Sequence, residues 1–257
     1  MLLNDLKMIK PEKVDVAILT KNSERMLEKC LFSVYENVPV NKLIVVDGYS
    51  IDSTIEILRK FQQKYGNVEI IRTHGTRGYA RQIAIKHVET EWFMFVDSDV
   101  VLCKNWFKKA LRLIREDVGA IWGMEVWSTF LRERRSILEL FMRVNMKVFE
   151  QRGGTHDILI RKDALKGIKI PWQLHTYEDA YIKDWIVRSG FRVIPTYDPY
   201  CIHYRPEKAW TIKGSIEIAA GDLPHAVKRP QLIAAYAIFT GVVMRQIFIK
   251  KTKLKEF

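Results

Sequence analysis

The chain has 257 residues, a hydrophobic content of 48% and a formal net charge of +12. This length and composition support one large α/β domain with appendages, or two small domains, and exclude a disordered protein. The charge is uneven, because residues 208–257 hold nine Lys or Arg against three Asp or Glu. A basic end of this kind suggests an anionic partner such as nucleic acid or phospholipid headgroups, or simply favours solubility.

Strands and helices are predicted to alternate over the first hundred residues. Apolar runs predict strands at residues 14–19, 43–46, 68–71 and 92–96, and helical periodicity predicts helices between them, the last over residues 79–88. Such alternation implies parallel strands joined by right-handed crossovers. The predicted fold class is therefore α/β, with a Rossmann-like, mostly parallel central sheet flanked by helices.

Acidic residues follow two of these predicted strands. Asp97, Ser98 and Asp99 close the fourth strand, and Asp47 follows the second. Side chains i and i+2 of an extended chain point the same way, and open α/β sheets bind ligands at the carboxyl ends of their strands. Carboxylates there can hold a divalent cation against a diphosphate. An isolated D-x-D also fits a solvated turn, but acidic residues at two strand ends favour a shared crevice.

The second half of the chain shows a less regular pattern. Helices are predicted over residues 105–115 and 128–151 and from Tyr177 to Ser189, and strands over residues 120–126, 158–160, 191–194 and 200–204. The amphipathic helix over residues 128–151 is interpreted as core-facing, with a membrane-surface helix as the alternative. Glu178 and Asp179 can serve as an acidic cap that complements the dipole of their helix.

Cys30, Cys103 and Cys201 are widely spaced and form no C-x-x-C pair. They indicate neither a disulfide framework nor a zinc site, so a reducing interior is the simpler expectation. Residues 1–10 carry charges among their apolar residues and do not resemble a secretory signal. We therefore expect the amino-terminal domain on the cytosolic side.

Five motifs occur in an order that is typical of one known family. They are residues 16–22 (VAILTKN), 44–54 (IVVDGYSIDST), 78–81 (GYAR), 97–99 (DSD) and 177–179 (YED). On these motifs the chain resembles the inverting glycosyltransferases of family two, which have the GT-A fold. The resemblance extends over roughly residues 14–205, and it is to the membrane-associated mannosyltransferases and dolichyl-phosphate mannose synthases of that family.

The resemblance implies a role for each acidic residue. Asp47 would read the nucleotide base, Asp97 would bind the ribose or a metal, and Asp99 would bind the metal that bridges the diphosphate. Asp179, with Glu178 beside it, would be the general base that deprotonates the acceptor hydroxyl for in-line attack at the anomeric carbon. The expected cofactor is Mg²⁺ or Mn²⁺.

Other residues of the matching motifs are assigned to the nucleotide sugar. These are Thr20, Asn22, Arg81 and Ser98, together with Asp47, Asp97 and Arg205. His203 is a candidate third metal ligand, and Arg205 is a candidate to stabilise the leaving diphosphate. A lone histidine beside a strand also fits a purely structural role.

A catalytic domain is expected over residues 1–206, followed by a helical, basic segment over residues 207–257. Within that segment, residues 231–244 carry no charge, and after Arg245 and Gln246 the apolar stretch continues over residues 247–249. As a helix, residues 231–249 would extend about 28 Å, close to the hydrocarbon thickness of a bilayer, although a buried arginine is costly. This segment could span the bilayer, lie in its interface or pack on the catalytic domain. We expect some form of membrane association.

The predicted function is transfer of a hexose from a nucleotide sugar to a lipid phosphate or lipid-linked glycan at the cytoplasmic face of the cell membrane. Mannose from GDP-mannose is the first candidate, and nucleic acid is not an expected partner. A sugar-phosphate nucleotidylyltransferase is an alternative, but it would carry a Gly-rich basic loop where this chain has residues 20–23 (TKNS). The other alternative is a non-catalytic, basic module that binds nucleic acid or membrane.

Overall fold

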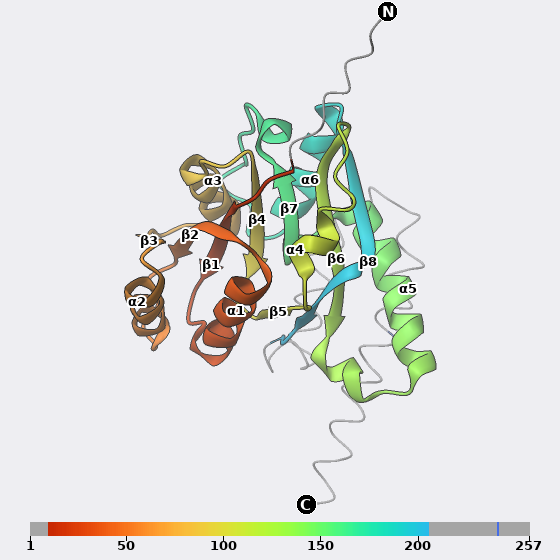
Figure 1. The fold of residues 1–257 in the computed structure, drawn as a ribbon, viewed down its shortest axis with the longest axis horizontal. Coiled ribbons are helices and arrows are strands. Elements are labelled where there is room, and N and C mark those ends of the chain that lie inside the picture. Colours follow the sequence, from red (N-terminus) through yellow and green to blue (C-terminus); the bar gives the residue numbers. More distant parts are fainter. Residues whose placement is uncertain (1–9, 206–240, 242–257) are drawn as a thin grey trace, which may run out of the picture.

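A single eight-stranded sheet forms the centre of the fold (Figure 1). The computed structural model describes residues 10–205 and residue 241. The strand order is β3-β2-β1-β4-β7-β6-β8-β5. The strands are β1 Val14–Thr20, β2 Val40–Asp47, β3 Val68–Arg72, β4 Trp92–Asp97, β5 Val100–Leu102, β6 Val118–Trp127, β7 Asp157–Arg161 and β8 Arg192–His203.

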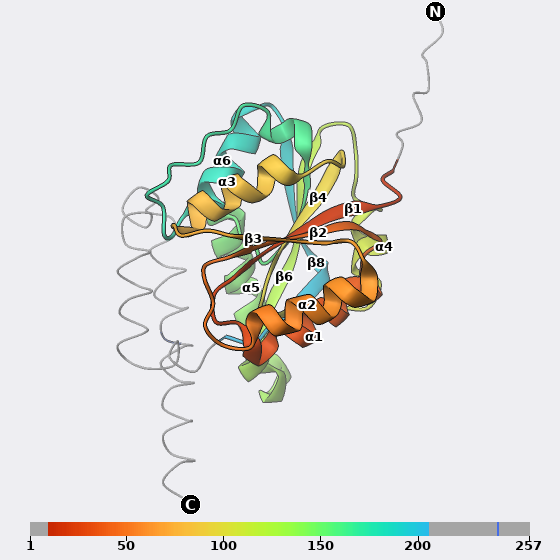
Figure 2. The ribbon, with the colours of Figure 1, turned by 90° about the vertical axis from the view of Figure 1, so that its left-hand side faces the viewer.

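Helices cover both faces of the sheet (Figure 2). They are α1 Glu24–Asn37, α2 Thr54–Tyr65, α3 Arg77–His87, α4 Trp106–Ala110, α5 Arg135–Arg152 and α6 Glu178–Arg188, with 3₁₀ turns η1 Ser128–Arg132 and η2 Lys162–Leu165. Helices α1, α2 and α4 pack on one face, and α3 and α6 pack on the other. Among the helices that the structure describes, none is both long and apolar enough to cross a bilayer.

Burial on both faces explains why the strands are continuous apolar runs. Along β1, Val16 and Ile18 join the hydrophobic cluster under α1 and α2, whereas Ala17 joins the cluster under α3 and α6. In β4, Met94 belongs to the cluster under α1 and α2, and Phe95 belongs to the cluster under α3 and α6. The sheet therefore has a core on each side, and only strand ends are available to form a site.

The prediction of a mostly parallel sheet holds in part. Strands β3, β2, β1 and β4 are parallel, and so are β6 and β8, but β7 pairs antiparallel with both β4 and β6, and β5 pairs antiparallel with β8. The alternation of strand and helix stops after β4, so the chain no longer returns by regular crossovers. The α/β class is confirmed, and the sheet is mixed.

Several element boundaries also differ from the prediction. The helix predicted over residues 105–115 ends at Ala110, and the one predicted over residues 128–151 is divided at Arg134, whose backbone is extended. The strands predicted at residues 191–194 and 200–204 are one strand, β8, which contains the cis bond Asp198–Pro199. Strand β5 is too short for a pattern to predict it. The apolar segment over residues 231–249 lies outside the described residues, apart from residue 241.

Candidate active site

Strand β8 brings a histidine to the acidic motif at the end of β4. His203 pairs with Val100 of β5 on one side and with Trp127 of β6 on the other. As a result, Nε2 of His203 lies 3.0 Å from Oδ1 of Asp99. Two of the three residues predicted as metal ligands, 104 positions apart in the chain, therefore face each other directly.

A third residue, Glu125, holds the other side of the histidine ring. Its Oε1 accepts hydrogen bonds from Nδ1 of His203 at 2.5 Å, from Nη2 of Arg205 at 2.9 Å and from Nε1 of Trp127 at 2.7 Å. Burial alone would raise the pKa of Glu125, but Arg205 and His203 outweigh it and hold that pKa well below its usual range. Glu125 is therefore a buried carboxylate that orients both His203 and Arg205.

The charge on His203 follows from the same contacts. Burial alone would lower the pKa of the imidazole, but Glu125 and Asp99 outweigh it and raise the pKa to about 9. The guanidinium of Arg205 lies 4.4 Å from the ring centre of Trp127. At this edge of the sheet His203 and Arg205 thus share one buried carboxylate as cations, and a metal ion bound at Nε2 of His203 would replace the proton on that nitrogen.

The donor set at Asp99 and His203 fits a divalent cation. A carboxylate oxygen and an imidazole nitrogen converge, and the far nitrogen of the imidazole is bound by a carboxylate, which is the usual support of a metal-ligating histidine. Asp97 is less available, because its Oδ1 is bound to Arg81 at 2.8 Å. Asp99 and His203 are therefore the pair that would hold Mg²⁺ or Mn²⁺.

Arg81 links the two acidic motifs. Its Nη2 donates to Asp97 and, at 2.8 Å, to Oγ1 of Thr155, and its guanidinium lies 4.5 Å from the ring centre of Phe95. Burial alone would raise the pKa of Asp97, but Arg81 and, after it, His203 hold it below its ordinary value. Within the described part of the chain, Nε and Nη1 of Arg81 are buried and have no hydrogen-bond partner. The arginine therefore has donors left for a ligand.

The charge of Arg81 also acts on Glu178, at the start of α6. Burial and the neighbouring Asp179 raise the pKa of Glu178 to about 7, while Arg81 and Arg77 oppose that rise. Helix α6, which begins with this acidic pair, packs on the same face of the sheet as α3, from which Arg81 reaches Asp97.

Asp179 is the less buried member of its pair. Its Oδ1 accepts from its neighbour's backbone at Ala180, and its Oδ2 lies 3.6 Å from Nη2 of Arg152, the last residue of α5. Gly153 follows the last residue of α5 with a φ of +89° and packs closely on the backbone of Asp179. A Cβ at Gly153 would lie 3.3 Å from the carbonyl oxygen of Asp179. Helix α5 thus contributes a cation beside the predicted base.

Asp47 is enclosed by its own loop. The side chain is fully buried, and its two oxygens accept from Oγ1 of Thr20, from the amide and hydroxyl of Ser50, and, more weakly at 3.4 Å, from Nε of Arg72. A carboxylate has about four acceptor positions, so these four contacts use all of them.

Asn22 and Ser98 have similar bracing contacts. Asn22 has a φ of +52°. Its side-chain Oδ1 accepts a hydrogen bond from the backbone amide of Ile51, and its backbone amide donates to the hydroxyl of Ser50. The hydroxyl of Ser98 lies 3.0 Å from that of Ser23. These residues tie the loops after β1, β2 and β4 together, so the predicted nucleotide-binding residues from three strands are brought to one edge.

A buried brace supports the acidic motif from behind. Nδ1 of His156 lies 2.5 Å from Oδ1 of Asp157, whose Oδ2 accepts from Nε1 of Trp106 at 2.8 Å. Cys201 adds a thiol 3.7 Å from the same imidazole nitrogen, and the carbonyl of His156 accepts from the amide of Asp97. Because all three side chains are buried and the second carboxylate oxygen is bound by Trp106, we interpret this group as packing that fixes the end of β4.

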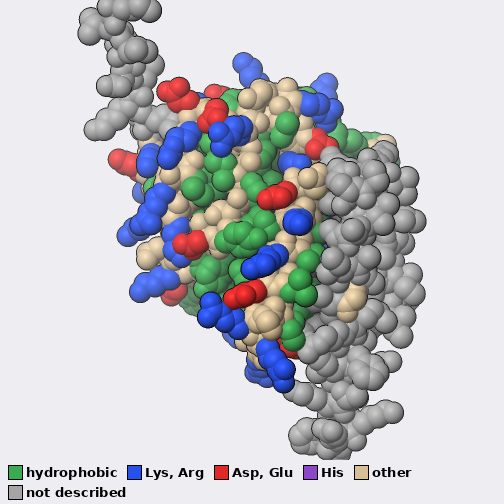
Figure 3. Space-filling model, turned by 90° about the vertical axis from the view of Figure 1, so that its right-hand side faces the viewer, with side chains coloured by type: hydrophobic (Ala, Val, Ile, Leu, Met, Phe, Trp, Pro, Cys, Tyr) green, Lys and Arg blue, Asp and Glu red, His purple; other side chains and the backbone are tan. Residues whose placement is uncertain are grey.

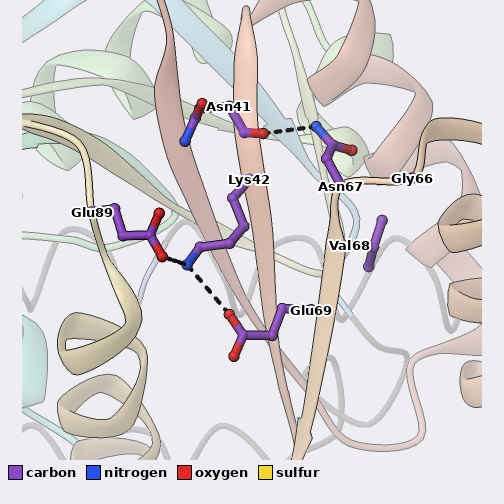
Figure 4. A pocket seen from close by; sticks show the side chains of 7 residues that line it. All are labelled: Asn41, Lys42, Gly66, Asn67, Val68, Glu69 and Glu89. Carbon is purple, nitrogen blue, oxygen red and sulfur yellow. Dashed lines mark hydrogen bonds and ion pairs between the residues drawn. The ribbon is translucent and has the colours of Figure 1, made fainter.

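The opposite edge of the sheet carries a separate hollow of about 350 Å³ (Figure 4). It is lined by the amino ends of β2 and β3 and by Glu89. Lys42 there bridges Glu89 at 2.5 Å and Glu69 at 3.4 Å, and Asn67 donates to the backbone of Asn41. Its polar groups are paired with each other, and it lies away from every residue of the acidic motifs.

Sequence reasoning did not single out Glu125, Arg152, or the pair of His156 and Asp157. A signal for Glu125 exists, since it is the one charged residue in the wholly buried strand β6, and a charge in such a run needs a partner. Arg152 had no comparable signal, because arginines at the end of an amphipathic helix are ordinary.

Comparison with known proteins agrees with this arrangement. The family model of glycosyl transferase family 2 matches residues 15–164. A poly(ribitol-phosphate) beta-glucosyltransferase of Bacillus spizizenii is 38% identical over 93 residues, which are 34% of this chain and 15% of that protein. The poly(ribitol-phosphate) beta-N-acetylglucosaminyltransferase TarS of Staphylococcus aureus is 34% identical over 109 residues, 40% of this chain and 19% of that protein. The matched part thus spans under a fifth of each relative.

Solved structures show the same fold. The mannosyltransferase PcManGT of Pyrobaculum calidifontis has a TM-score of 0.66 at 17% identity, covering 94% of this chain and 74% of that one. TarS residues 1–349 have a TM-score of 0.59 at 23% identity, covering 76% and 59%. The family match extends over more than half of the chain, and it favours neither nucleotidyl transfer nor a non-catalytic module. The protein therefore belongs to glycosyl transferase family 2, and its likeness to these structures shows a GT-A-like fold.

Proposed function

We propose that the chain is an inverting hexosyltransferase that uses a nucleotide sugar and a lipid phosphate or lipid-linked glycan acceptor. The observation that carries the proposal is the position of Arg81 on α3, whose guanidinium binds Asp97 and whose helix packs on the same face of the sheet as α6, which begins with Glu178. This supports a donor-side motif and an acceptor-side motif near one another, as transfer between two substrates requires.

The similar proteins support a nucleotide-sugar donor. TarS was solved with UDP-GlcNAc, and the Pyrobaculum mannosyltransferase was solved with GDP-Man and Mn²⁺. Mannose from GDP-mannose is our first proposed donor. The names of the curated relatives include a poly(ribitol-phosphate) acceptor, which supports an anionic, phosphate-containing acceptor in this protein as well.

The proposed chemistry is a single displacement. Asp179 accepts the proton of the acceptor hydroxyl, whose oxygen attacks the anomeric carbon as the bond to the nucleoside diphosphate breaks. One displacement inverts the anomeric centre and needs no covalent sugar–enzyme intermediate. Arg152 orients the carboxylate of Asp179 from the end of α5.

The leaving diphosphate would be bound on the other side of the crevice. Asp99 and His203 would hold a divalent cation, whose positive charge would stabilise the departing diphosphate. The unpaired nitrogens of Arg81 and the guanidinium of Arg205 add cationic donors there. Thr20, Asn22, Asp47 and Ser98 shape the loops that would receive the nucleoside.

We further propose that residues 1–206 form the catalytic domain and that residues 207–257 attach it to the cytoplasmic face of the cell membrane. The excess of nine basic over three acidic residues in residues 208–257 supports binding to anionic headgroups. On the face shown in Figure 3, Lys and Arg side chains lie along one margin and singly across the surface, with hydrophobic side chains between them. On this face, among the described residues, the basic side chains form no continuous groove of the kind that tracks a nucleic acid.

A thermal-shift panel tests the proposal. We expect one nucleotide sugar among GDP-mannose, UDP-glucose and UDP-GlcNAc to raise the melting temperature, and to do so more strongly with Mn²⁺ or Mg²⁺ than with EDTA, because a ligand of the native state stabilises it by mass action. The ligand that does so identifies the donor. A melting temperature unmoved by every nucleotide sugar, with or without metal, would contradict the proposed function.

A further inference from the structure

Three side chains form a stack at the carboxyl ends of β2 and β3. The ring centres of Tyr49 and His74 are 4.0 Å apart with an interplanar angle of 14°, and the guanidinium of Arg72 lies 4.7 Å from the ring centre of Tyr49. All three side chains are exposed, and 42% of Tyr49 is accessible to solvent. The stack thus lies at the edge of the sheet that carries the acidic motifs, and it does not contribute to the core.

The backbone of Tyr49 is unusual for an aromatic residue. Its φ is +57°, in the left-handed region that glycine adopts without strain and a bulky side chain adopts only at a cost. Tyr49 is held there by the loop between Asp47 and Ser50. A strained position with an exposed ring points to a task for that ring outside the core.

The adjoining carboxylate does not offer an alternative contact for a base. All four acceptor positions of Asp47 are used by Thr20, Ser50 and Arg72, and the side chain is fully buried. An N–H of a nucleobase could therefore bind Asp47 only by displacing one of these donors. The face of an aromatic stack, in contrast, can receive any planar base without displacing a hydrogen bond.

We propose that the outer face of His74, backed by Tyr49 and then by Arg72, receives the nucleobase of the nucleotide sugar by face-to-face contact. In this arrangement Asp47 positions the loop that carries Tyr49, and His74 at the end of the stack touches the substrate. The inference rests on the proposed function, because it assumes that a nucleotide binds at this edge, and it adds the residue that contacts the base. It also gives Arg72 a role, since its cation strengthens the stack from the side of Tyr49.

The test compares ligands with and without a base on the full-length chain. Calorimetric titration with UDP, GDP and dTDP in Mg²⁺ identifies the nucleoside diphosphate that wild type binds best, and Mg²⁺-pyrophosphate serves as the base-free probe. His74→Ala should weaken binding of that nucleoside diphosphate about ten-fold, because loss of one aromatic contact to a base has an effect of that size. Tyr49→Ala should weaken it to a smaller extent, because it removes the ring that supports His74. Binding of pyrophosphate should be unchanged, and Tyr49→Phe should bind like wild type.

The controls separate the inference from the function on which it rests. Tyr197→Ala removes a similarly exposed tyrosine from β8 and should change neither affinity. Wild-type affinity for the nucleoside diphosphate in both Tyr49→Ala and His74→Ala would overturn the inference and leave the proposed function standing. If the variants bound the nucleoside diphosphate and pyrophosphate more weakly to the same extent, the inference would also be overturned, because the lost contact would then be to the phosphates. Failure of wild type to bind any nucleoside diphosphate would overturn both proposals.

Discussion

Glu125 accepts a hydrogen bond from Nδ1 of His203 at 2.5 Å, and so determines that Nε2 is the ring nitrogen that faces Asp99. The two residues come from neighbouring strands of the sheet, β6 and β8. Since the carboxylate is almost fully buried, its orientation is set by the sheet and not by solvent. The histidine is therefore presented to the crevice in one ring orientation.

The first prediction concerns this orientation. Glu125→Gln should weaken Mn²⁺ binding by about 10- to 100-fold, because the amide keeps the shape of the side chain but loses the charge that holds the imidazole. Calorimetry or electron paramagnetic resonance of Mn²⁺ on the purified chain measures this without any transfer assay. Glu139→Gln, an exposed change on α5, is the control and should bind as wild type does. Unchanged Mn²⁺ affinity in Glu125→Gln would show that Glu125 does not support a metal ligand.

The second prediction concerns Asp179 as the base. Asp179→Asn should lower the rate of transfer by about 10²- to 10⁴-fold, because an amide cannot accept the proton of the acceptor hydroxyl. Donor binding, measured by the thermal shift of the best nucleotide sugar, should be retained. Asp163→Asn, an exposed residue of η2, is the matched control. Transfer at the wild-type rate in Asp179→Asn would exclude this residue as the base.

The parts of the fold that could be predicted from the sequence are those made by local pattern. Strands β1 to β4 and their helices follow from apolar runs and helical periodicity, and Asp47, Asp97 and Asp99 follow from their places at strand ends. The pairing of β7, β6 and β8 could not be predicted in this way, because it depends on long-range register. His203 reaches Asp99 only through that register, so its contact with Asp99 needed the structure.

The occupancy of Asp47 could not be predicted either. Its motif suggests a carboxylate that is open to a nucleotide base, but the contacts that use its oxygens come from Thr20, Ser50 and Arg72 on three different segments. Only their positions in space reveal that the carboxylate is occupied. The same is true of the stack of Tyr49 on His74, whose members are 25 residues apart.

The third prediction is a pH dependence of stability due to Glu178. Burial and Asp179 raise its pKa from 4.5 to about 7, and the nearby charges of Arg81 and Arg77 do not cancel the rise. The folded state therefore binds more protons than the unfolded state between about pH 4.5 and 7, so this group costs stability as the pH rises through that window. In urea unfolding, the free energy of unfolding of Glu178→Gln relative to wild type should rise by up to about 3 kcal/mol from pH 5 to pH 8.

The control for that measurement is Glu56→Gln, an exposed change on α2. Because its carboxyl is solvated in both states, its difference from wild type should stay the same at pH 5 and pH 8. A constant difference between Glu178→Gln and wild type at the two pH values would show that the Glu178 carboxyl is ionised normally in the folded chain.

The fourth prediction tests the brace behind the acidic motif. A Cβ at Gly123 would lie 2.3 Å from Oδ2 of Asp157 and 2.7 Å from the carbonyl oxygen of Pro199, and both distances are shorter than a van der Waals contact. Gly123→Ala should therefore lower the free energy of unfolding by about 1–3 kcal/mol, the usual cost of overpacking a core. Gly66→Ala has open space around its Cβ and a φ of +72°, so it should cost only about 1 kcal/mol of backbone strain. If urea unfolding finds Gly123→Ala as stable as wild type, β6 and β8 do not pack against Asp157 as closely as the structure shows.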